Sequence, residues 1–592
     1  QRAHAARPNR ISTRRVVWVL LFFVAFGAYN TYRVFSVQVL QHEFLSVKAE
    51  NLIAWSDEIP PRRGLIYDSR GQLLAGNVTA RDVDVDISRH KDDESKKAVA
   101  DKLAPILGQD PKALYTKLKE APEGTVSVRV ATKVDDATVE KIRKLIEEEE
   151  DLFAFTISMR KVPLRQYPGG TLAASLLGYT DYANIGHYGV EEYYNKDLAG
   201  EAGWIFAEHD NQGRPLVLEQ PQMQLAKDGS DLVLTIDSAV QYIVERGLKQ
   251  ALDEYKAESG YVIVQDPNTG AILAMANYPS YDPNAFNKEN NYEKFKNVSV
   301  SNIVEAGSTM KVLTYASAID AGAVLSTTTV NIEACWYKYG WPLCNAENKS
   351  WGIQTMTVGL GRSANVASMF AAEHLGEKRF YDYMQAFRLG RPTGVDIAGE
   401  VGGTLWLPGE PEYSPVNLYT NSFGQGVSVT PIQLINAVSA VANGGTLYKP
   451  YVMQEVRQGE QVIDRNEPQI LRAGVIKPDT GQQIANMMAW GVENKLVARL
   501  ARVPGYHVSV KTGTAQIPGC GGYCDDQTLA SAIGFAPSQQ PKFTLYIALY
   551  NPRTSPWGEN TASPAWGKIA KELLLYMKVQ PTEPVETPTP QP

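Results

Sequence analysis

The chain has 592 residues, of which 44% are hydrophobic and 21% charged, so most of it can bury apolar cores and fold. Its 58 Lys and Arg against 65 Asp and Glu give a net charge of −7, which argues against a surface that wraps nucleic acid. A mean hydropathy of −0.25 excludes a polytopic membrane protein, and seven singly scattered His, without a pair at metal-ligand spacing, disfavour a zinc enzyme.

One apolar segment lies near the N-terminus. Val16 to Tyr32 is a run of 17 uncharged residues, and apolar character resumes after Arg33 as far as Leu40. At ~1.5 Å per residue, a helix over residues 16–40 crosses a ~30 Å hydrocarbon layer with some tilt. Five arginines precede this segment and four acidic residues follow it: Arg2, Arg7, Arg10, Arg14 and Arg15, then Glu43, Glu50, Asp57 and Glu58. We therefore predict a cytoplasmic tail over residues 1–15, an uncleaved single-pass anchor over residues 16–40, and the rest outside the cytoplasm.

The pattern of predicted strands and helices beyond the anchor changes near residue 230. From about 58 to 225, short strands alternate with charged helical stretches such as Asp92–Leu107 and Asp135–Asp151. We predict a first region over residues 41–229 and a second over residues 230–578. A proline-rich tail over residues 579–592 carries no apolar pattern and is predicted to be disordered.

The second region begins and ends with strand patterns. Asp237 is a predicted N-cap for an amphipathic helix, and a turn over residues 266–270 separates the strands Tyr261–Gln265 and Ala271–Ala276. Three late strands and a helix over residues 565–578 close the region, the strands being His507–Val510, Ala530–Phe535 and Phe543–Tyr550. Strands at both ends with helices between them predict an α+β fold around one mainly antiparallel sheet.

The four cysteines form two close pairs, Cys335 with Cys344 and Cys520 with Cys524. An oxidising exterior permits disulfides, and short rings are the simplest of the three possible connectivities. Neither pair has C-x-x-C spacing, so a shared metal site is the weaker interpretation.

The first chemical motif is Ser308-Thr309-Met310-Lys311, which opens an apolar run to Ile319. Positions i and i+3 lie one turn apart on a helix face, which brings the lysine amine near the serine hydroxyl. Lysine can activate a serine when burial or neighbouring positive charge displaces its proton. The pattern alone is weak, because Ser88 to Lys91 matches it by chance.

Two further motifs follow. Ser363-Ala364-Asn365 is the only S-x-N in the chain, and Lys511-Thr512-Gly513-Thr514 directly follows the strand pattern His507–Val510. Ser363 could relay a proton, and the amide of Asn365 could orient a carbonyl or the lysine. A strand edge can pair with an extended peptide, its lysine and threonines can hold a carboxylate, and Gly513 allows close approach. Taken singly, each motif is also compatible with ordinary loop or surface residues.

The three motifs in this order resemble those of the penicillin-binding proteins and serine β-lactamases. Other segments resemble landmarks of the class B, monofunctional penicillin-binding proteins, namely Arg63–Asp68, Tyr167–Gly170, Gly189–Tyr194, Leu234–Asp237 and Phe423–Gly426. The stretch Tyr179–Gly200 is most similar to the division-type, FtsI-like members. Two positions depart from the family pattern: Ala306 stands where proline is usual, and Val510 where a small residue is usual. Val510 should point away from the cleft if Lys511 points into it.

The resemblance implies a transmembrane helix, an elongated α/β pedestal over residues 41–229, and a transpeptidase domain over residues 230–578 with its antiparallel sheet flanked by helices. It implies that Ser308 attacks a D-Ala-D-Ala stem peptide, with Lys311, Ser363, Asn365 and Lys511 as catalytic partners. The backbone N–H groups of Ser308 and Thr514 would form the oxyanion hole. Thr512, Gly513 and Thr514 would bind the substrate or a β-lactam, and an amine from a second stem peptide would resolve the acyl-enzyme.

The resemblance also implies that no metal or organic cofactor is needed. It implies a partner of the SEDS type, a polytopic FtsW-like or RodA-like glycosyltransferase, bound through the anchor and pedestal. Two alternatives stay open: an elongation-type transpeptidase, and a membrane scaffold that activates the glycosyltransferase while its serine site is secondary.

Other enzyme classes fit less well. A β-lactamase needs neither anchor nor pedestal, a bifunctional enzyme would need a further domain within residues 41–225, and a Ser-His-Asp hydrolase would show a G-x-S-x-G motif. Arg63, Gly64 and Asp68 are interpreted as structural. A cluster of aromatic residues either lines the cleft or packs on its neighbours: Trp336, Tyr337, Tyr339 and Trp341.

Overall fold

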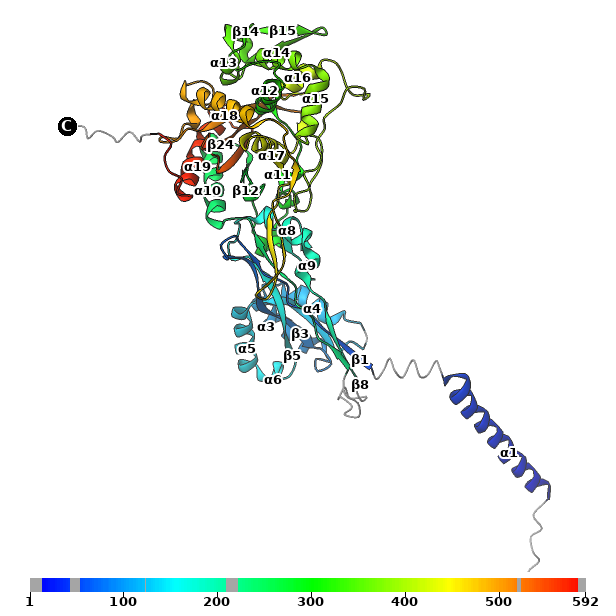
Figure 1. Ribbon diagram of the computed structural model, residues 1–592. Coiled ribbons are helices and arrows are strands. Elements are labelled where there is room, and N and C mark those ends of the chain that lie inside the picture. Colours follow the sequence, from blue (N-terminus) through cyan, green and yellow to red (C-terminus); the bar gives the residue numbers. More distant parts are fainter. Residues whose placement is uncertain (1–12, 43–53, 123, 209–221, 519–522, 584–592) are drawn as a thin grey trace, which may run out of the picture. The chain divides into compact units, whose positions relative to one another are not determined.

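The computed structural model describes residues 13–42, 54–122, 124–208, 222–518 and 523–583 (Figure 1). The chain divides into two compact units, one made of residues 1–61 and 201–228 and the other of residues 62–200 and 229–592.

The first unit contains the apolar segment. Helix α1 (Thr13–Phe35) continues into a π-helical turn, η1 (Ser36–Leu40). Residues 16–40 together make 25 residues that are long and apolar enough to cross a membrane, in agreement with the predicted single-pass anchor. A separate antiparallel sheet in this unit has the order β1-β8-β9, with bounds β1 (Ala54–Ile59), β8 (Gly203–Glu208) and β9 (Gln222–Gln224).

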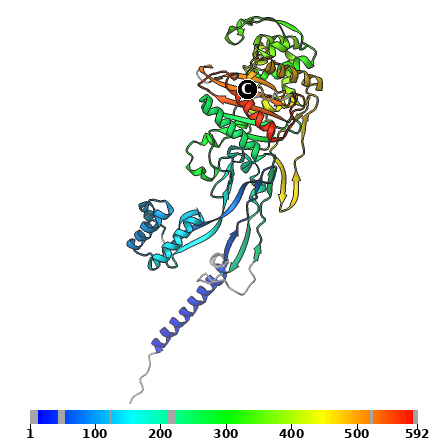
Figure 2. The ribbon, with the colours of Figure 1, turned by 90° about the vertical axis from the view of Figure 1, so that its left-hand side faces the viewer.

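The second unit begins with a seven-stranded sheet of order β21-β20-β10-β2-β3-β4, to which β5 adds by pairing with β3. Its strands are β2 (Ile66–Tyr67), β3 (Leu73–Asp86), β4 (Ser127–Val134), β5 (Ile157–Gln166), β10 (Asp231–Leu234), β20 (Met453–Gln458) and β21 (Gln461–Arg465). In Figures 1 and 2, the yellow hairpin β20–β21 runs beside strands that come from the early part of the chain. Residues nearly 400 positions apart therefore share one sheet, from β2 to β21.

Four helices pack on the β3–β4–β5 part of this sheet: α3 (Asp93–Leu107), α4 (Pro111–Lys119), α5 (Asp136–Glu148) and α6 (Glu150–Phe153). The carboxylate of Asp92 caps α3 by accepting from Ser95 N, and that of Asp135 caps α5 by accepting from Thr138 N. Their apolar faces meet β3 in one buried cluster, so the helical stretches predicted there are confirmed.

A buried network of polar side chains lies beside these strands. Arg63 and Arg165 both donate to the carboxylate of Glu191, and the Asp68 carboxylate accepts from Ser238 N at the start of α10. Short elements surround this network: α7 (Ala174–Leu177), β6 (Tyr179–Thr180), β7 (Gly186–His187), α8 (Gly189–Tyr193) and α9 (Asn195–Ala199). The structural interpretation of Arg63 and Asp68 agrees with these contacts.

The central sheet of the second unit is antiparallel, with the order β12-β11-β25-β24-β23. Its strands are β11 (Ser259–Gln265), β12 (Ile272–Tyr278), β23 (Ser509–Pro518), β24 (Tyr523–Ala536) and β25 (Phe543–Tyr550). The first and last strand groups come together through the β11–β25 pair, as predicted, and β23 lies at the edge.

Helices cover both faces of this sheet. Alternate residues of β11 point to opposite faces of the sheet. Val262 packs towards α10 (Ser238–Tyr255) and α19 (Ala562–Tyr576). Tyr261 packs towards α12 (Lys311–Asp320) and α17 (Pro431–Ala442). Every residue of α12 from Lys311 to Ile319 is buried, so α12 runs through the core of the unit.

The remaining helices are η2 (Pro283–Lys288), η3 (Tyr292–Phe295), α11 (Val298–Ser301), η4 (Gly307–Met310), η5 (Ala346–Asn348), α13 (Met356–Gly361), α14 (Asn365–Leu375), α15 (Glu377–Ala386), α16 (Asn417–Ser422), α18 (Pro478–Glu493) and η6 (Arg499–Ala501). The remaining strands form small pairs: β13 (Val304–Glu305) with β18 (Ser428–Val429), β14 (Thr329–Ile332) with β17 (Gly352–Thr355), β15 (Cys335–Lys338) with β16 (Trp341–Cys344), and β19 (Leu447–Tyr448) with β22 (Ile470–Arg472).

Two local predictions need correction. The strand predicted at His507–Val510 runs from Ser509 to Pro518, because β24 pairs with it along that length, so the lysine motif lies inside the strand. The disorder predicted from residue 579 is wrong for Thr582 and Glu583, whose N–H groups donate to Gly505 O at 2.8 and 3.1 Å. Residues 584–592 lie outside the described part of the chain.

Candidate active site

Ser308 lies in the 3-10 turn η4, directly before α12. The turn is held by a loop from residues 423–426, since Gly307 N donates to Gly424 O at 3.0 Å. A Cβ on Gly424 would lie 1.9 Å from Gly307 O, so only glycine allows this approach. The Ser308 hydroxyl is half-buried and makes no hydrogen bond to any of the described residues.

Lys311, one turn beyond Ser308, is completely buried. Its Nζ donates to Ser363 O at 2.6 Å and to Asn365 Oδ1 at 2.6 Å, with Ser363 Oγ at 3.3 Å. Within the described part of the chain, no carboxylate forms an ion pair with this ammonium. Burial and the nearby charge of Lys511 hold the pKa of Lys311 well below its usual value. The structure therefore favours a neutral amine that can accept a proton.

Ser363 connects the two lysines. Its Oγ accepts from Lys511 Nζ at 2.7 Å and lies 3.3 Å from Lys311 Nζ. Its backbone has φ of +57°, in the left-handed region that few non-glycine residues adopt. This conformation places both the carbonyl and the hydroxyl of Ser363 against the lysines. Backbone strain of this kind is found at functional sites.

Lys511 comes from the edge strand β23. Its Nζ also donates to Thr512 O at 2.8 Å, and burial lowers the pKa of Lys511 to about 7. Val510 packs into the cluster on the α10–α19 face, while Lys511 reaches Ser363, so the predicted opposite orientations of Val510 and Lys511 are confirmed.

The edge strand passes very close to the serine turn. A Cβ on Gly513 would lie 2.4 Å from Ser531 Oγ and 3.0 Å from Thr309 Cγ2, so a larger residue here would displace these side chains. Thr512 is buried, and Thr514 Oγ1 accepts from Gly558 N at 3.1 Å. Gly558 was not found from the sequence, because no motif includes it.

The structure thus joins four of the predicted residues in one hydrogen-bonded group: Lys311, Ser363, Asn365 and Lys511. Ser308 lies in the turn η4 that leads directly into Lys311, the first residue of α12. The sequence spacing of the histidines disfavours a zinc enzyme, but spacing does not detect groups that the fold assembles. The fold brings His507 together with Glu493 and Glu583, their ligand atoms all within 4.8 Å of one another. That group contains none of the predicted catalytic residues.

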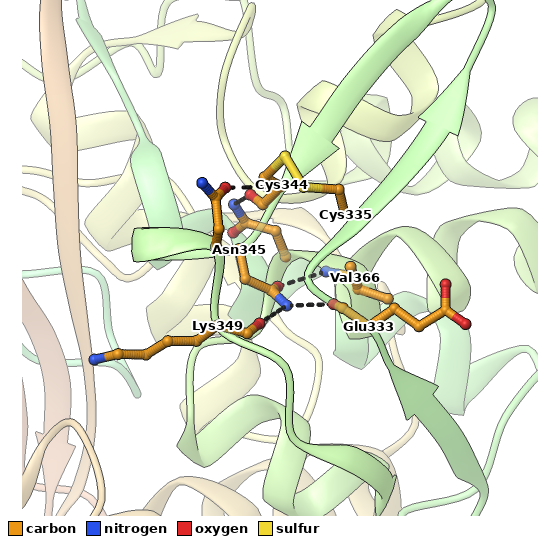
Figure 3. The surroundings of a disulfide bond; sticks show 8 residues. Glu333, Cys335, Cys344, Asn345, Lys349 and Val366 are labelled. Carbon is orange, nitrogen blue, oxygen red and sulfur yellow. Dashed lines mark hydrogen bonds between the residues drawn. A yellow bond between two sulfur atoms is a disulfide. The ribbon is translucent and has the colours of Figure 1, made fainter.

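One of the predicted disulfides is present. Cys335 and Cys344 are bonded and face each other across the β15–β16 hairpin (Figure 3). Cys520 lies outside the described residues, as does the side chain of Cys524, so the second pairing stays a prediction. On the same hairpin, Tyr337, Tyr339 and Trp341 are exposed, whereas Trp336 packs partly against the core.

Comparison with known proteins agrees with this site. Residues 260–575 match the family described as the penicillin binding protein transpeptidase domain, and residues 58–234 match the penicillin-binding protein dimerisation domain. Stage V sporulation protein D of Bacillus subtilis is 32% identical over 586 residues, covering 97% of this chain and 88% of the relative. Peptidoglycan D,D-transpeptidase FtsI of Escherichia coli is 28% identical over 559 residues, covering 93% and 89%.

Solved structures show the same fold. Penicillin binding protein 3 of Mycobacterium tuberculosis, in complex with aztreonam, aligns with a TM-score of 0.68 and 25% identity, covering 89% of this chain and 99% of that one. Together, the two matched domains and the relatives that align along nearly the whole length show that the chain belongs to the class B penicillin-binding proteins and is a peptidoglycan D,D-transpeptidase.

Proposed function

We propose that Ser308 is the nucleophile of this transpeptidase and that it attacks the penultimate D-alanine carbonyl of a D-Ala-D-Ala stem peptide. The Oγ–carbon bond forms as the Oγ proton passes to the amine of Lys311. The peptide bond to the terminal D-alanine then breaks, and Ser363 relays a proton to the departing amine. An amine of a second stem peptide attacks the resulting ester, forms the cross-link and returns the proton to Ser308.

The other site residues have proposed binding roles. The backbone N–H groups of Ser308 and Thr514 form the oxyanion hole, an effect worth ~10²–10³ in rate per donor. Lys511, Thr512, Gly513 and Thr514 hold the terminal carboxylate of the donor, or the carboxylate of a β-lactam that mimics it. Asn365 holds Lys311 through its Oδ1.

The observation that carries this proposal is the hydroxyl of Ser363 between two buried lysines that lack a carboxylate partner among the described residues. A structural lysine in a protein core is normally paired, because an unpaired buried charge is costly. Two unpaired lysines at one serine are instead suited to proton transfer and to binding an anionic substrate.

Labelling with fluorescent penicillin tests the proposal. The full chain in detergent is expected to take up a covalent label that Ser308→Ala abolishes. Ser88→Ala is the matched control, because Ser88 belongs to the other S-x-x-K sequence and should label like wild type. A wild-type protein that takes up no label would rule out the acyl-enzyme on Ser308 and favour the scaffold role.

The pH dependence of acylation tests the role of Lys511. Because its pKa lies at about 7, Lys511 loses the charge that holds a carboxylate as the pH rises through this value. The second-order rate constant for penicillin acylation is therefore expected to fall on the alkaline side with an apparent pKa near 7. Arginine stays charged, so Lys511→Arg should move this decline beyond pH 10, whatever its absolute rate. Stopped-flow labelling of both proteins from pH 5 to 10 shows whether the variant loses the decline near pH 7, and an unchanged alkaline limb in the variant would contradict the assignment.

We further propose a division-type role, supported by the similarity to FtsI of Escherichia coli. The sporulation relative of Bacillus subtilis makes a specialised wall-building role the alternative. A fluorescent fusion distinguishes these roles from elongation, because a division enzyme collects at the septum and an elongation enzyme along the lateral wall.

The proposed topology has residues 1–15 in the cytoplasm, residues 16–40 in the membrane, the pedestal over 41–229 and the transpeptidase domain over 230–578 outside. The arginine-rich flank of the apolar segment supports this orientation. We also propose a polytopic FtsW-like or RodA-like glycosyltransferase as the partner of the anchor and pedestal. Co-purification of the full chain, compared with a chain whose residues 16–40 are replaced by an unrelated membrane helix, tests that partnership.

A further inference from the structure

The start of helix α14, which carries Asn365, is held by a residue that no motif marks. The N-cap position of α14 is Ala364, whose side chain cannot accept a hydrogen bond from the helix. The N–H of Val366 instead donates to Oδ1 of Asn345, 21 residues earlier, at 3.1 Å. Asn345 therefore acts as a cap supplied from another part of the chain.

Asn345 also closes the loop from which it comes. Its Nδ2 donates to Glu333 O at 2.8 Å and to Lys349 O at 2.9 Å, which joins the segments before and after the disulfide-bonded hairpin. Figure 3 shows these bonds meeting at Asn345, next to Cys344. The side chain is 3% exposed, and both of its donors and its oxygen are used. Its position is therefore fixed on three sides.

The residue before Asn345 sets the orientation of the Asn365 amide. Asn365 Nδ2 donates to Cys344 O at 2.7 Å, while its Oδ1 accepts from Lys311 Nζ at 2.6 Å. A carbonyl oxygen can only accept, so the amide nitrogen must face Cys344 and the amide oxygen must face the lysine. Without this carbonyl, the amide of Asn365 could turn its NH₂ group towards Lys311.

We propose that Asn345 is a positioning residue for acyl transfer, acting through Asn365. It fixes the start of α14 and the Cys344 carbonyl together, so that the Asn365 oxygen faces Lys311. This inference rests on the proposed function, in which Lys311 takes the proton of Ser308.

The test compares Asn345→Ala with Asn331→Ala, an exposed asparagine of the neighbouring strand β14. Loss of Asn345 is expected to slow the acylation step at saturating penicillin by about 10–100-fold, as displaced catalytic groups commonly do. The concentration for half-maximal rate should change little, because the residues proposed to hold the carboxylate are untouched. Asn331→Ala should behave like wild type. An equal rate for wild type and Asn345→Ala would overturn the proposal.

Action through Asn365 gives a sharper result. If Asn345 works only by placing Asn365, the double variant Asn345→Ala, Asn365→Ala should be no slower than Asn365→Ala alone. If the rate losses of the two single variants instead multiplied in the double variant, the proposal would be contradicted. An acceptor oxygen favours the charged form of Lys311, so its misplacement should also move the acid limb of the pH–rate profile to lower pH. A structural defect that only reduced the amount of folded enzyme would leave that limb unmoved.

Asn345→Asp keeps the proposal testable if the alanine variant does not fold. Aspartate has the same shape and keeps an acceptor for Val366 N–H, but loses both donors to the carbonyls of Glu333 and Lys349. The acylation rate of Asn345→Asp is expected to lie between those of wild type and Asn345→Ala. If Asn345→Ala does not fold, the rate of Asn345→Asp is expected to lie below that of wild type. If both variants fold, wild-type rates for both would overturn the inference. If only Asn345→Asp folds, a wild-type rate for that variant would overturn it. Failure of wild type itself to label would overturn the proposed function instead.

Discussion

Replacement of Lys311 by alanine is expected to slow acylation of Ser308 by about 10²–10⁴-fold, the usual contribution of a positioned general base. Lys311 follows the serine by one turn, and its Nζ is held by Ser363 O and Asn365 Oδ1. Burial and the charge of Lys511 lower the pKa of Lys311 well below its usual value, which favours the unprotonated amine that a general base requires. The rate constant for covalent labelling by fluorescent penicillin measures the effect.

Lys311→Arg separates base catalysis from simple positioning. A guanidinium can donate to the same oxygens but does not lose its proton in the working pH range. The arginine variant is therefore expected to be about as slow as the alanine variant, and near-wild-type acylation would exclude Lys311 as the base. Lys378→Ala removes an exposed lysine of α15 that pairs with Asp382, and is expected to leave the rate unchanged.

Lys311 is also expected to affect how the free energy of unfolding depends on pH. A buried lysine whose pKa is lowered binds fewer protons in the folded state than in the unfolded state, between its folded pKa and its ordinary value of 10.5. The free energy of unfolding then rises with pH in this window, which for Lys511 extends from about 7 to 10.5. Lys311→Ala should flatten the slope, as measured by denaturant unfolding at several pH values. An unchanged slope would mean that Lys311 is not neutral in the folded protein.

The sequence was sufficient to predict the residues that the fold joins at the candidate site, because each belongs to a short motif whose spacing reflects local geometry. Lys311 follows Ser308 by one turn, and Ser363 precedes Asn365 at the start of a helix. The helix after Asp237 and a hairpin of strands Tyr261–Gln265 and Ala271–Ala276 are also predicted, since capping and alternation are local signals, and the structure has both, with β11 and β12 as the strands.

Features that depend on distant partners could not be predicted. Lysine and glycine are depleted in strands and weaken the strand pattern after Val510, yet pairing with β24 extends β23 through Lys511 to Pro518. Nothing near Asn345 in sequence indicates Val366 as its partner, because the contact spans 21 residues. Hairpin β20–β21 likewise joins strands encoded far upstream, and only the assembled sheet shows this. Local periodicity carries no information about such long-range pairings.

The second large effect is expected at Glu191, where Glu191→Ala should destabilise the protein by about 3–5 kcal/mol or prevent folding. Its carboxylate is completely buried and accepts from Arg63 Nε at 2.8 Å, Arg165 Nε at 2.7 Å and Tyr167 OH at 3.1 Å. Removal of the carboxylate would leave two buried guanidinium groups without their counter-charge. The measurement is the free energy of unfolding in denaturant, on the full chain in detergent.

The pH dependence of this site has a definite sign. Burial acts to raise the pKa of Glu191, but the charges and hydrogen bonds of Arg165 and Arg63 outweigh it and lower the pKa below 4.5. The contribution to stability is therefore present above pH 4.5 and is lost as the pH falls through the folded pKa. Glu191→Gln keeps the shape but not the charge, so it should lose this acid-dependent part.

Glu140→Ala provides the matched control for Glu191. Glu140 pairs with Arg143 three residues later on the exposed side of α5, in the same unit of the chain. An exposed pair of this kind contributes about 0–1 kcal/mol, so its loss should barely move the unfolding midpoint. A Glu191 variant no less stable than the Glu140 variant would show that Arg63 and Arg165 find other partners or water. In that case, the ion pairs of Arg63 and Arg165 with Glu191 would not be needed to hold these residues together.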